Sequence, residues 1–281
     1  MPDASDHAVL ITVDDLVESM LSNRPPAVLD IRWQLGRDDG AERYRDGHLP
    51  GAVYVDLESE LAAPADPALG RHPLPDLERL QASARSWGVD FGSPVVVYDD
   101  SAGMSAARAW WLLRWAGVAD VRILDGGFGA WRDAGMRVSK GDAKPRTGTV
   151  TLSAGAMPTV DMNDVAATSA IVLDARAGER FRGEVEPVDP RPGHIPGAVS
   201  APTSDNVDAS GRFLPPSVLR ARFADLGVTP GQDVVVYCGS GVTAAHQIAA
   251  LAVAGIDATL YPGSYSQWSS DPTRPVETSL P

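Results

Sequence analysis

The chain has 281 residues, of which 44% are hydrophobic and 22% charged, a composition typical of a globular protein with one large domain or two of ordinary size. Its formal net charge of −13 would repel phosphate backbones and anionic lipid headgroups, so we expect no nucleic acid and no membrane partner. No apolar stretch reaches the roughly 20 residues of a membrane span, and the N-terminus lacks the basic and apolar regions of a secretory signal. A single cysteine cannot form an internal disulfide, and we therefore expect a cytoplasmic protein.

Short β-branched runs alternate with helical patterns along the chain. In chain order the predicted strands are 28–31, 94–98, 121–124, 171–174, 233–237 and 258–261, and the clearest helical patterns are 104–117 and 242–255. Continuous apolar strands that alternate with helices predict parallel sheets buried on both faces. Functional loops are expected at the carboxyl ends of such strands.

Four segments of the first half recur in the same order in the second half. They are "AVLDIRW" (27–33) with "IVLDARA" (171–177), "DGHLPGAVYVD" (46–56) with "PGHIPGAVSAP" (192–202), "PVVVYDD" (94–100) with "DVVVYCG" (233–239), and "RILDGGFGAW" (122–131) with "ATLYPGSYSQW" (258–268). The repeat predicts two homologous α/β domains, each a parallel sheet flanked by helices. We place them at 1–140 and 158–281, with a linker at 141–157 that is rich in Gly, Pro, Ser and Thr.

The only cysteine, Cys238, stands in "VVVYCGSGVTA", where a buried strand ends and a helix begins. Gly239 and Gly241 allow a loop that turns N–H groups inward around the sulfur, and Thr243 is predicted to cap the helix. Such a loop and the start of a helix both favour a thiolate and can hold an anion beside it. The alternative is a cysteine that only packs, but the repeat places Asp99 opposite Cys238, so a cysteine is not required there for folding.

A cysteine followed by a short loop and a helix is also found in cysteine phosphatases, in which an arginine closes the loop. Here Ala244 stands at the closing position. Without a guanidinium to clamp a phosphate, ester hydrolysis is disfavoured. A thiolate in a neutral loop is better suited to carrying a second sulfur.

The two "GH-[LI]-PGA" segments, "LDGGFGAW", "DARAGERFRG" and "CGSGVTA" together resemble the tandem-domain rhodanese and 3-mercaptopyruvate sulfurtransferase family. The resemblance implies two rhodanese-like domains, of which only the C-terminal one is catalytic. It also implies that Cys238 takes sulfur from a small anionic donor as a persulfide and passes it to cyanide or to a thiol acceptor such as thioredoxin. No pair of residues has the spacing of a metal site, and we expect no metal and no organic cofactor.

The resemblance also implies roles for other residues. Thiosulfate-type members carry cations after the cysteine, whereas the neutral Gly239 and Ser240 resemble the mercaptopyruvate type. In that type Ser240 would act in a proton relay with His48 and an aspartate, Asp38 or alternatively Asp39. His194 occupies the same motif as His48 without a clear catalytic role, which favours a structural reading of His48.

Substrate binding is implied for a second set of residues. Arg180 matches the substrate-binding arginine of the family, and Arg191 matches a second arginine only loosely. The loop residues that complete the predicted binding set are Gly239, Gly241, Val242 and Thr243.

Several other side chains are expected to be structural. His246 is expected on the helix surface or in packing, and Tyr265 and Trp268 in the core or at its rim. His7 and His72 belong to no recognisable constellation.

The leading hypothesis is a sulfurtransferase that prefers 3-mercaptopyruvate. The alternatives are thiosulfate as the main donor, a persulfide carrier with little turnover, and a purely structural Cys238.

Overall fold

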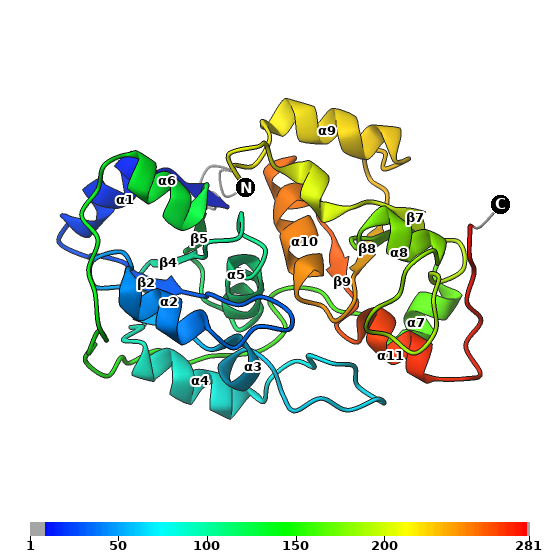
Figure 1. The fold of residues 1–281 in the computed structure, drawn as a ribbon, viewed down its shortest axis with the longest axis horizontal. Coiled ribbons are helices and arrows are strands. Elements are labelled where there is room, and N and C mark those ends of the chain that lie inside the picture. Colours follow the sequence, from blue (N-terminus) through cyan, green and yellow to red (C-terminus); the bar gives the residue numbers. More distant parts are fainter. Residues whose placement is uncertain (1–8, 280–281) are drawn as a thin grey trace. The chain divides into compact units, whose positions relative to one another are not determined.

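The computed structural model describes residues 9–279, and His7 lies outside this range (Figure 1). The described chain forms two compact units. The first unit comprises residues 9–61, 75–157 and 208–213, and the second comprises 62–74, 158–207 and 214–279.

The first unit contains a five-stranded parallel sheet in the order β1-β5-β4-β2-β3. Its strands are β1 (Leu10–Ile11), β2 (Ala27–Asp30), β3 (Val53–Tyr54), β4 (Val95–Tyr98) and β5 (Val121–Leu124). Its helices are α1 (Val13–Met20), α2 (Gly40–Asp46), α3 (Leu57–Glu60), α4 (Leu77–Ser86), α5 (Ala106–Trp115) and α6 (Gly127–Asp133).

The second unit contains a four-stranded parallel sheet in the order β7-β6-β8-β9. Its strands are β6 (Ile171–Asp174), β7 (Val199–Ser200), β8 (Val234–Tyr237) and β9 (Thr259–Leu260). Its helices are α7 (Met162–Ala167), α8 (Gly178–Arg182), the 3₁₀ helix η1 (Thr203–Asn206), α9 (Pro216–Asp225), α10 (Thr243–Val253) and α11 (Ser264–Ser270). This strand order repeats the order β3-β2-β4-β5 of the first unit, so the predicted pair of homologous α/β folds is confirmed.

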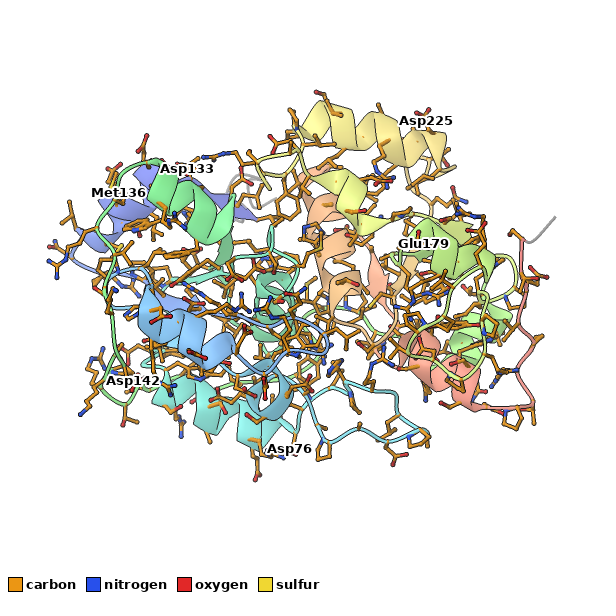
Figure 2. The ribbon with its side chains drawn as sticks, viewed as in Figure 1. Asp76, Asp133, Met136, Asp142, Glu179 and Asp225 are labelled. Atoms are coloured by element: carbon orange, nitrogen blue, oxygen red, sulfur yellow. The ribbon has the colours of Figure 1, made fainter. Side chains whose placement is uncertain are left out.

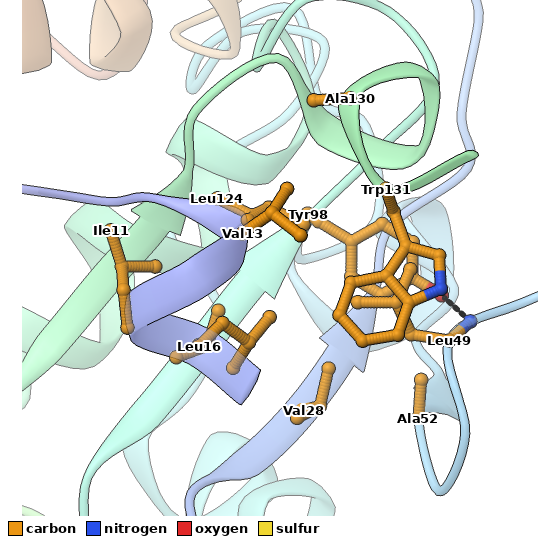
Figure 3. Close-up of a cluster of buried hydrophobic side chains, with 11 residues drawn as sticks. Ile11, Val13, Leu16, Val28, Leu49, Ala52, Tyr98, Leu124, Ala130 and Trp131 are labelled. Atoms are coloured by element: carbon orange, nitrogen blue, oxygen red, sulfur yellow. Dashed lines mark hydrogen bonds between the residues drawn. The ribbon is translucent and has the colours of Figure 1, made fainter. Parts of the chain in front are cut away.

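The central strands β4 and β8 are buried along their whole length, which explains why both read as the continuous run "VVVY". In the first unit, apolar side chains from β2, β4, α1 and α6 pack into one cluster, drawn in Figure 3. Tyr98 ends β4 inside this cluster, and its hydroxyl accepts the N–H of Leu49 at 3.0 Å. The core thereby fixes the chain at the carboxyl edge of the sheet.

The segment 141–157, predicted as a linker, forms neither helix nor strand but packs on the first unit. Val150 and Leu152 are buried, with 3% and 6% exposed. The N–H of Gly148 donates to the carbonyl of Arg85 at 2.7 Å. These contacts assign the segment to the first unit.

Two short segments belong to the unit formed mainly by the other repeat. Residues 62–74 belong to the second unit, and 208–213 belong to the first. The two segments align with each other, because "GRHPLP" (70–75) corresponds to "GRFLPP" (211–216). The internal symmetry therefore extends to this reciprocal exchange.

Acidic side chains lie at the surface, in line with the net charge. Asp76, Asp133, Asp142, Glu179 and Asp225, labelled in Figure 2, are all exposed. Among residues 9–279 no helix has the length and apolar character to cross a membrane.

The loop after β4 surrounds the carboxylate of Asp99, which is fully buried. One oxygen accepts the N–H groups of Ser101 and Gly103, and the other accepts those of Ser105 and Ala106, all at 2.8–2.9 Å. Burial raises the pKa of Asp99, although the four N–H groups act in the opposite direction. The first unit thus holds an acceptor side chain where the second has Cys238.

Substituting Asp99→Ala should lower the free energy of unfolding of the first unit by about 2–4 kcal/mol, because four N–H groups of the loop, three of them buried, lose their acceptor. Asp142→Ala, which removes an exposed partner of Arg45, should change it by less than about 0.5 kcal/mol. Urea unfolding followed by tryptophan fluorescence measures this, since only Trp268 of the seven tryptophans lies in the second unit. Equal losses in the two variants would show that the loop does not depend on this carboxylate.

Candidate functional site

Cys238 follows the last residue of β8 and is buried, with 2% of its surface exposed. The N–H of Gly241 donates to its sulfur at 3.1 Å. Helix α10 begins at Thr243, directly after the loop, so the positive end of its dipole also lies at this loop. Both features stabilise negative charge on the sulfur.

The prediction that Thr243 caps α10 is wrong. Thr243 is the first residue of the helix, and the residue at the cap position is Val242, which has helical backbone angles and no capping side chain. The helix follows the glycine loop without an intervening extended residue. The N–H groups of its first turn are therefore not satisfied by a side-chain cap and can serve an anion in the loop.

The segment that begins α11 holds the backbone of the cysteine loop. The hydroxyl of Ser264 accepts the N–H of Cys238 at 3.2 Å. The N–H of Tyr265 donates to the carbonyl of Cys238 at 2.9 Å, and that of Ser266 to the carbonyl of Gly239 at 2.8 Å. Ser264 has a φ of +52°, a strained conformation for a residue other than glycine. The strained residue is therefore the one whose hydroxyl holds the backbone of Cys238 in place.

A buried ion pair lies beside the end of β8. Arg176 contacts the carboxylate of Asp174 at 2.6 Å and donates to the carbonyl of Gly193 at 2.7 Å. Its guanidinium also lies 3.9 Å from the ring centroid of Tyr265. Burial opposes the charge of Arg176, but the Asp174 carboxylate outweighs it and raises the pKa of Arg176 overall.

Ser240, two residues after Cys238, contacts a histidine that the sequence did not assign to any site. Nδ1 of His72 lies 2.7 Å from the hydroxyl of Ser240, and both residues are buried. His72 comes from segment 62–74, and its repeat counterpart in the first unit is Phe213. The alignment of Gly70-Arg71-His72 with Gly211-Arg212-Phe213 shows that the segment belongs to the repeat, but it does not place His72 beside Ser240.

His48 lies in the first unit in a packed environment. Its Nδ1 is 2.9 Å from the carbonyl of Tyr44, and its ring stacks on that of Tyr44 at 4.1 Å. His194 has the same environment in the second unit, with Nδ1 2.7 Å from the carbonyl of Phe181 and ring stacking at 3.7 Å. This equivalence favours a structural role for both histidines. The relay role of His48 stays a prediction.

The two aspartates proposed as partners of His48 differ in their surroundings. Asp38 is exposed. Asp39 contacts Arg37 and Arg43, and the hydrogen bond from Arg37, together with the charges of both arginines, lowers the pKa of Asp39. Neither contact involves His48, so their relay role stays a prediction as well.

Arg180 lies next to the cysteine loop together with an arginine that the sequence did not single out. Arg180 contacts Glu186 at 2.7 Å and Asp189 at 2.9 Å. Arg71 contacts the other oxygen of Asp189 at 2.7 Å. A Cβ atom built on Gly239 would lie 3.1 Å from Nη2 of Arg71 and 3.5 Å from Nη1 of Arg180. Two guanidinium groups therefore meet beside the residue that follows Cys238.

Arg191 is placed differently from Arg180. Its three guanidinium nitrogens donate to main-chain carbonyls at the end of α11 and beyond it, those of Trp268, Ser269, Asp271 and Arg274, at 2.7–3.0 Å. These bonds favour a structural role. Its assignment to substrate binding stays a prediction.

The remaining side chains considered in the sequence are buried. His246 is fully buried, with Nδ1 2.7 Å from the hydroxyl of Thr203, so it packs rather than lying on the helix surface. Tyr265 and Trp268 belong to the core of the second unit. Within residues 9–279 no group of three or more His, Cys, Asp or Glu side chains could hold a metal ion.

A cysteine at the end of a central parallel strand, with the N–H of Gly241 on its sulfur and two arginines beside its loop, is an arrangement suited to transferring a group through a thiolate. The profile of the rhodanese-like domain matches residues 13–134 and again 161–271. The chain belongs to the rhodanese family.

Relatives match over nearly the whole chain. A Mycobacterium tuberculosis protein provisionally named thiosulfate sulfurtransferase SseB is 50% identical over 95% of this chain and 96% of its own length. A Pseudomonas aeruginosa protein provisionally named 3-mercaptopyruvate sulfurtransferase is 46% identical over 96% of this chain and 98% of its own length. The crystal structure of the 3-mercaptopyruvate sulfurtransferase SseA from Escherichia coli matches with a TM-score of 0.81 and 33% identity, over 92% of this chain and 99% of that one.

Substituting Gly70→Ala should displace Arg71 and His72, because Gly70 has a φ of +99° and a Cβ there would lie 2.6 Å from the carbonyl oxygen of Gly263. Gly155→Ala is the matched control, with a φ of +101° and nothing within 4 Å of its Cβ. The alkylation rate of native Cys238 by iodoacetamide should rise roughly threefold or more in the first variant only, because a displaced His72 loses its contact with Ser240 and the cysteine loop becomes more accessible. Equal rates in both variants would contradict this role of segment 62–74.

Proposed function

We propose that the protein is a sulfurtransferase that takes sulfur from 3-mercaptopyruvate onto Cys238 and passes it to a thiol acceptor such as thioredoxin. Membership of the rhodanese family and the names of the aligned relatives support the reaction class. The single cysteine, located in an anion-stabilising loop, supports Cys238 as the sulfur carrier. The absence of a second cysteine for a disulfide is why we place the reaction in the reducing cytoplasm.

In the first step the Cys238 thiolate attacks the thiol sulfur of 3-mercaptopyruvate. A sulfur–sulfur bond forms as the carbon–sulfur bond of the donor breaks, and the carbon leaves as the enolate of pyruvate. The enolate must then take up a proton to become pyruvate. The N–H of Gly241 stabilises the persulfide that remains on Cys238.

The contact between Ser240 and His72 is the observation that favours 3-mercaptopyruvate over thiosulfate as the donor. An enolate leaving group needs a proton, and a hydroxyl bonded to a histidine can deliver one. Thiosulfate would leave sulfite, which departs with its electron pair and needs no proton. A relay next to the nucleophile is therefore of use with mercaptopyruvate and dispensable with thiosulfate.

In the second step the thiolate of an acceptor attacks the outer sulfur of the persulfide. The outer sulfur moves to the acceptor, which becomes a persulfide, and Cys238 returns as a thiolate. Cyanide can replace the thiol acceptor and leaves as thiocyanate. Splitting one transfer into two steps lets donor and acceptor use the same loop in turn.

Thiosulfate as the main donor is the second candidate, favoured by the name of the Mycobacterium tuberculosis relative. It predicts a higher kcat/KM with thiosulfate than with 3-mercaptopyruvate in a thiocyanate assay. A persulfide carrier with little turnover is a third possibility. It predicts a persulfide on Cys238 in the intact mass but almost no turnover with either donor.

The variant Cys238→Ser should abolish transfer from both donors. His72→Gln should lower kcat with 3-mercaptopyruvate about 100-fold, because general acid catalysis contributes about that much. With thiosulfate the same variant should stay within about threefold, since no proton is needed. His48→Gln is the matched variant for the alternative relay predicted from the sequence. A donor-selective loss in His48→Gln and none in His72→Gln would overturn the assignment to His72.

A further inference from the structure

We propose that Arg71 joins Arg180, the substrate-binding arginine implied by the family resemblance, in holding the carboxylate of the donor at Gly239, and that Arg71 selects donors with a carboxylate near the transferable sulfur. The proposal rests on the proposed function for the identity of the donor. It adds a binding residue from segment 62–74, outside the repeat that carries the nucleophile.

The two guanidinium groups are held in place and still have unused donors. Asp189, whose side chain is only 1% exposed, takes Nη1 of Arg71 with one oxygen and Nη2 of Arg180 with the other. Within the described chain, Nη2 of Arg71 and Nη1 of Arg180 make no hydrogen bond, and Nε of Arg71 is buried without a partner. These two Nη atoms are the ones that approach Gly239. Asp189 therefore orients both groups and leaves donors for an incoming anion.

The backbone conformation at position 239 does not explain why a glycine stands there. Gly239 does not have a positive φ, so a residue with a side chain could adopt its backbone conformation. A Cβ at this position would instead meet the two guanidinium groups. A glycine keeps this space open for a ligand next to Cys238.

The first unit contains a counterpart of this site, and there a carboxylate of the chain itself takes the place proposed for the carboxylate of the donor. "ERYRDGH" (42–48) aligns with "ERFRG" (179–183), so Arg43 corresponds to Arg180, and "YDD" (98–100) aligns with "YCG" (237–239). The carboxylate of Asp100, in the position of Gly239, is bonded to Nη1 of Arg43. The first unit thus holds a carboxylate on this arginine permanently, where the second unit has a glycine.

The buried neighbour of Asp100 completes the comparison. Asp99 takes the position of Cys238, and its carboxylate accepts the inward N–H groups of the loop. The pair Asp99 and Asp100 therefore occupies the two anionic positions that the second unit reserves for its thiolate and for the carboxylate of its donor. This correspondence points to Gly239 as the position of the donor carboxylate.

The test uses the reaction of Cys238 with iodoacetate and with iodoacetamide, two reagents that differ in a carboxylate. Because the chain has one cysteine, the intact mass reports this site alone. The ratio of the two rates, divided by the same ratio for N-acetylcysteine, should exceed one in the wild type. In Arg71→Gln it should fall about tenfold, the effect of one lost charge-assisted hydrogen bond, while the iodoacetamide rate changes little.

Arg182→Gln is the matched control, because Arg182 lies on the same helix as Arg180 but is exposed and paired with Glu184. It should leave the ratio unchanged. An unchanged ratio in Arg71→Gln, or an equal fall in Arg182→Gln, would overturn the subsite.

A second pair of variants tests the subsite without removing an arginine. Gly239→Asp introduces the carboxylate that the first unit carries and should lower the iodoacetate to iodoacetamide ratio about tenfold, because it occupies the two guanidinium groups. Gly239→Asn has nearly the same shape without the charge and should lower the ratio much less. Equal effects of both variants would mean that the position is only crowded, and the proposal would fail.

Measurements of turnover distinguish a failure of the anion subsite from a failure of the proposed function. Arg71→Gln should raise KM for 3-mercaptopyruvate about tenfold and leave kcat within about threefold, because it removes binding rather than chemistry. If the wild type does not turn over 3-mercaptopyruvate but keeps the Arg71-dependent preference for iodoacetate, the function fails and the anion subsite stands. If turnover is normal and both KM and the alkylation ratio ignore Arg71→Gln, the subsite fails and the function stands.

Discussion

In each unit the loop after the central strand directs main-chain N–H at one buried side chain. Four N–H groups reach Asp99 in the first unit, and that of Gly241 reaches Cys238 in the second. Such groups are costly to bury without an acceptor. The fold therefore requires an acceptor at the carboxyl end of β4 and of β8, but it does not specify a carboxylate or a sulfur. A buried carboxylate meets this requirement without reactivity. A thiolate meets it and can also act as a nucleophile.

A buried network repeated in both units positions this loop. In the first unit Arg32 contacts Asp30 at 3.0 Å and donates to the carbonyl of Gly47 at 2.6 Å, while the hydroxyl of Tyr98 donates to Asp30. Burial raises the pKa of Asp30 to about 6, although Arg32 acts in the opposite direction. The corresponding Arg176 holds the carbonyl of Gly193, so in each unit a buried arginine anchors the "GH-[LI]-PGA" motif to the edge of the sheet.

The sequence was sufficient for features set by local patterns and was insufficient for those set by tertiary packing. Strands β4 and β8 are continuous apolar runs, so their burial and the position of Cys238 at a strand end could be predicted. Arg71 and His72 could not be placed by pattern, because segment 62–74 has no helix and only an isolated bridge. Its position depends on contacts such as that of the Arg71 N–H with the Ser266 hydroxyl. The cap at Thr243 failed by one residue because α10 follows the glycine loop directly.

In the second unit the N–H group on the sulfur belongs to the cysteine loop, whereas the nearby cations belong to other segments. This separation has a chemical consequence. In a loop with its own cation, one positive charge would stabilise the thiolate and also attract the donor, so the two effects could not be adjusted separately. Here the N–H of Gly241 supports the sulfur, whereas Arg71 and Arg180 reach the loop from other segments. In the proposed reaction, the carboxylate of pyruvate leaves the arginines when pyruvate departs, and the persulfide stays on Cys238 in a loop whose charge has not changed. The acceptor then meets two arginines with vacant donors, a suitable environment for an anionic thiolate or for a cyanide ion.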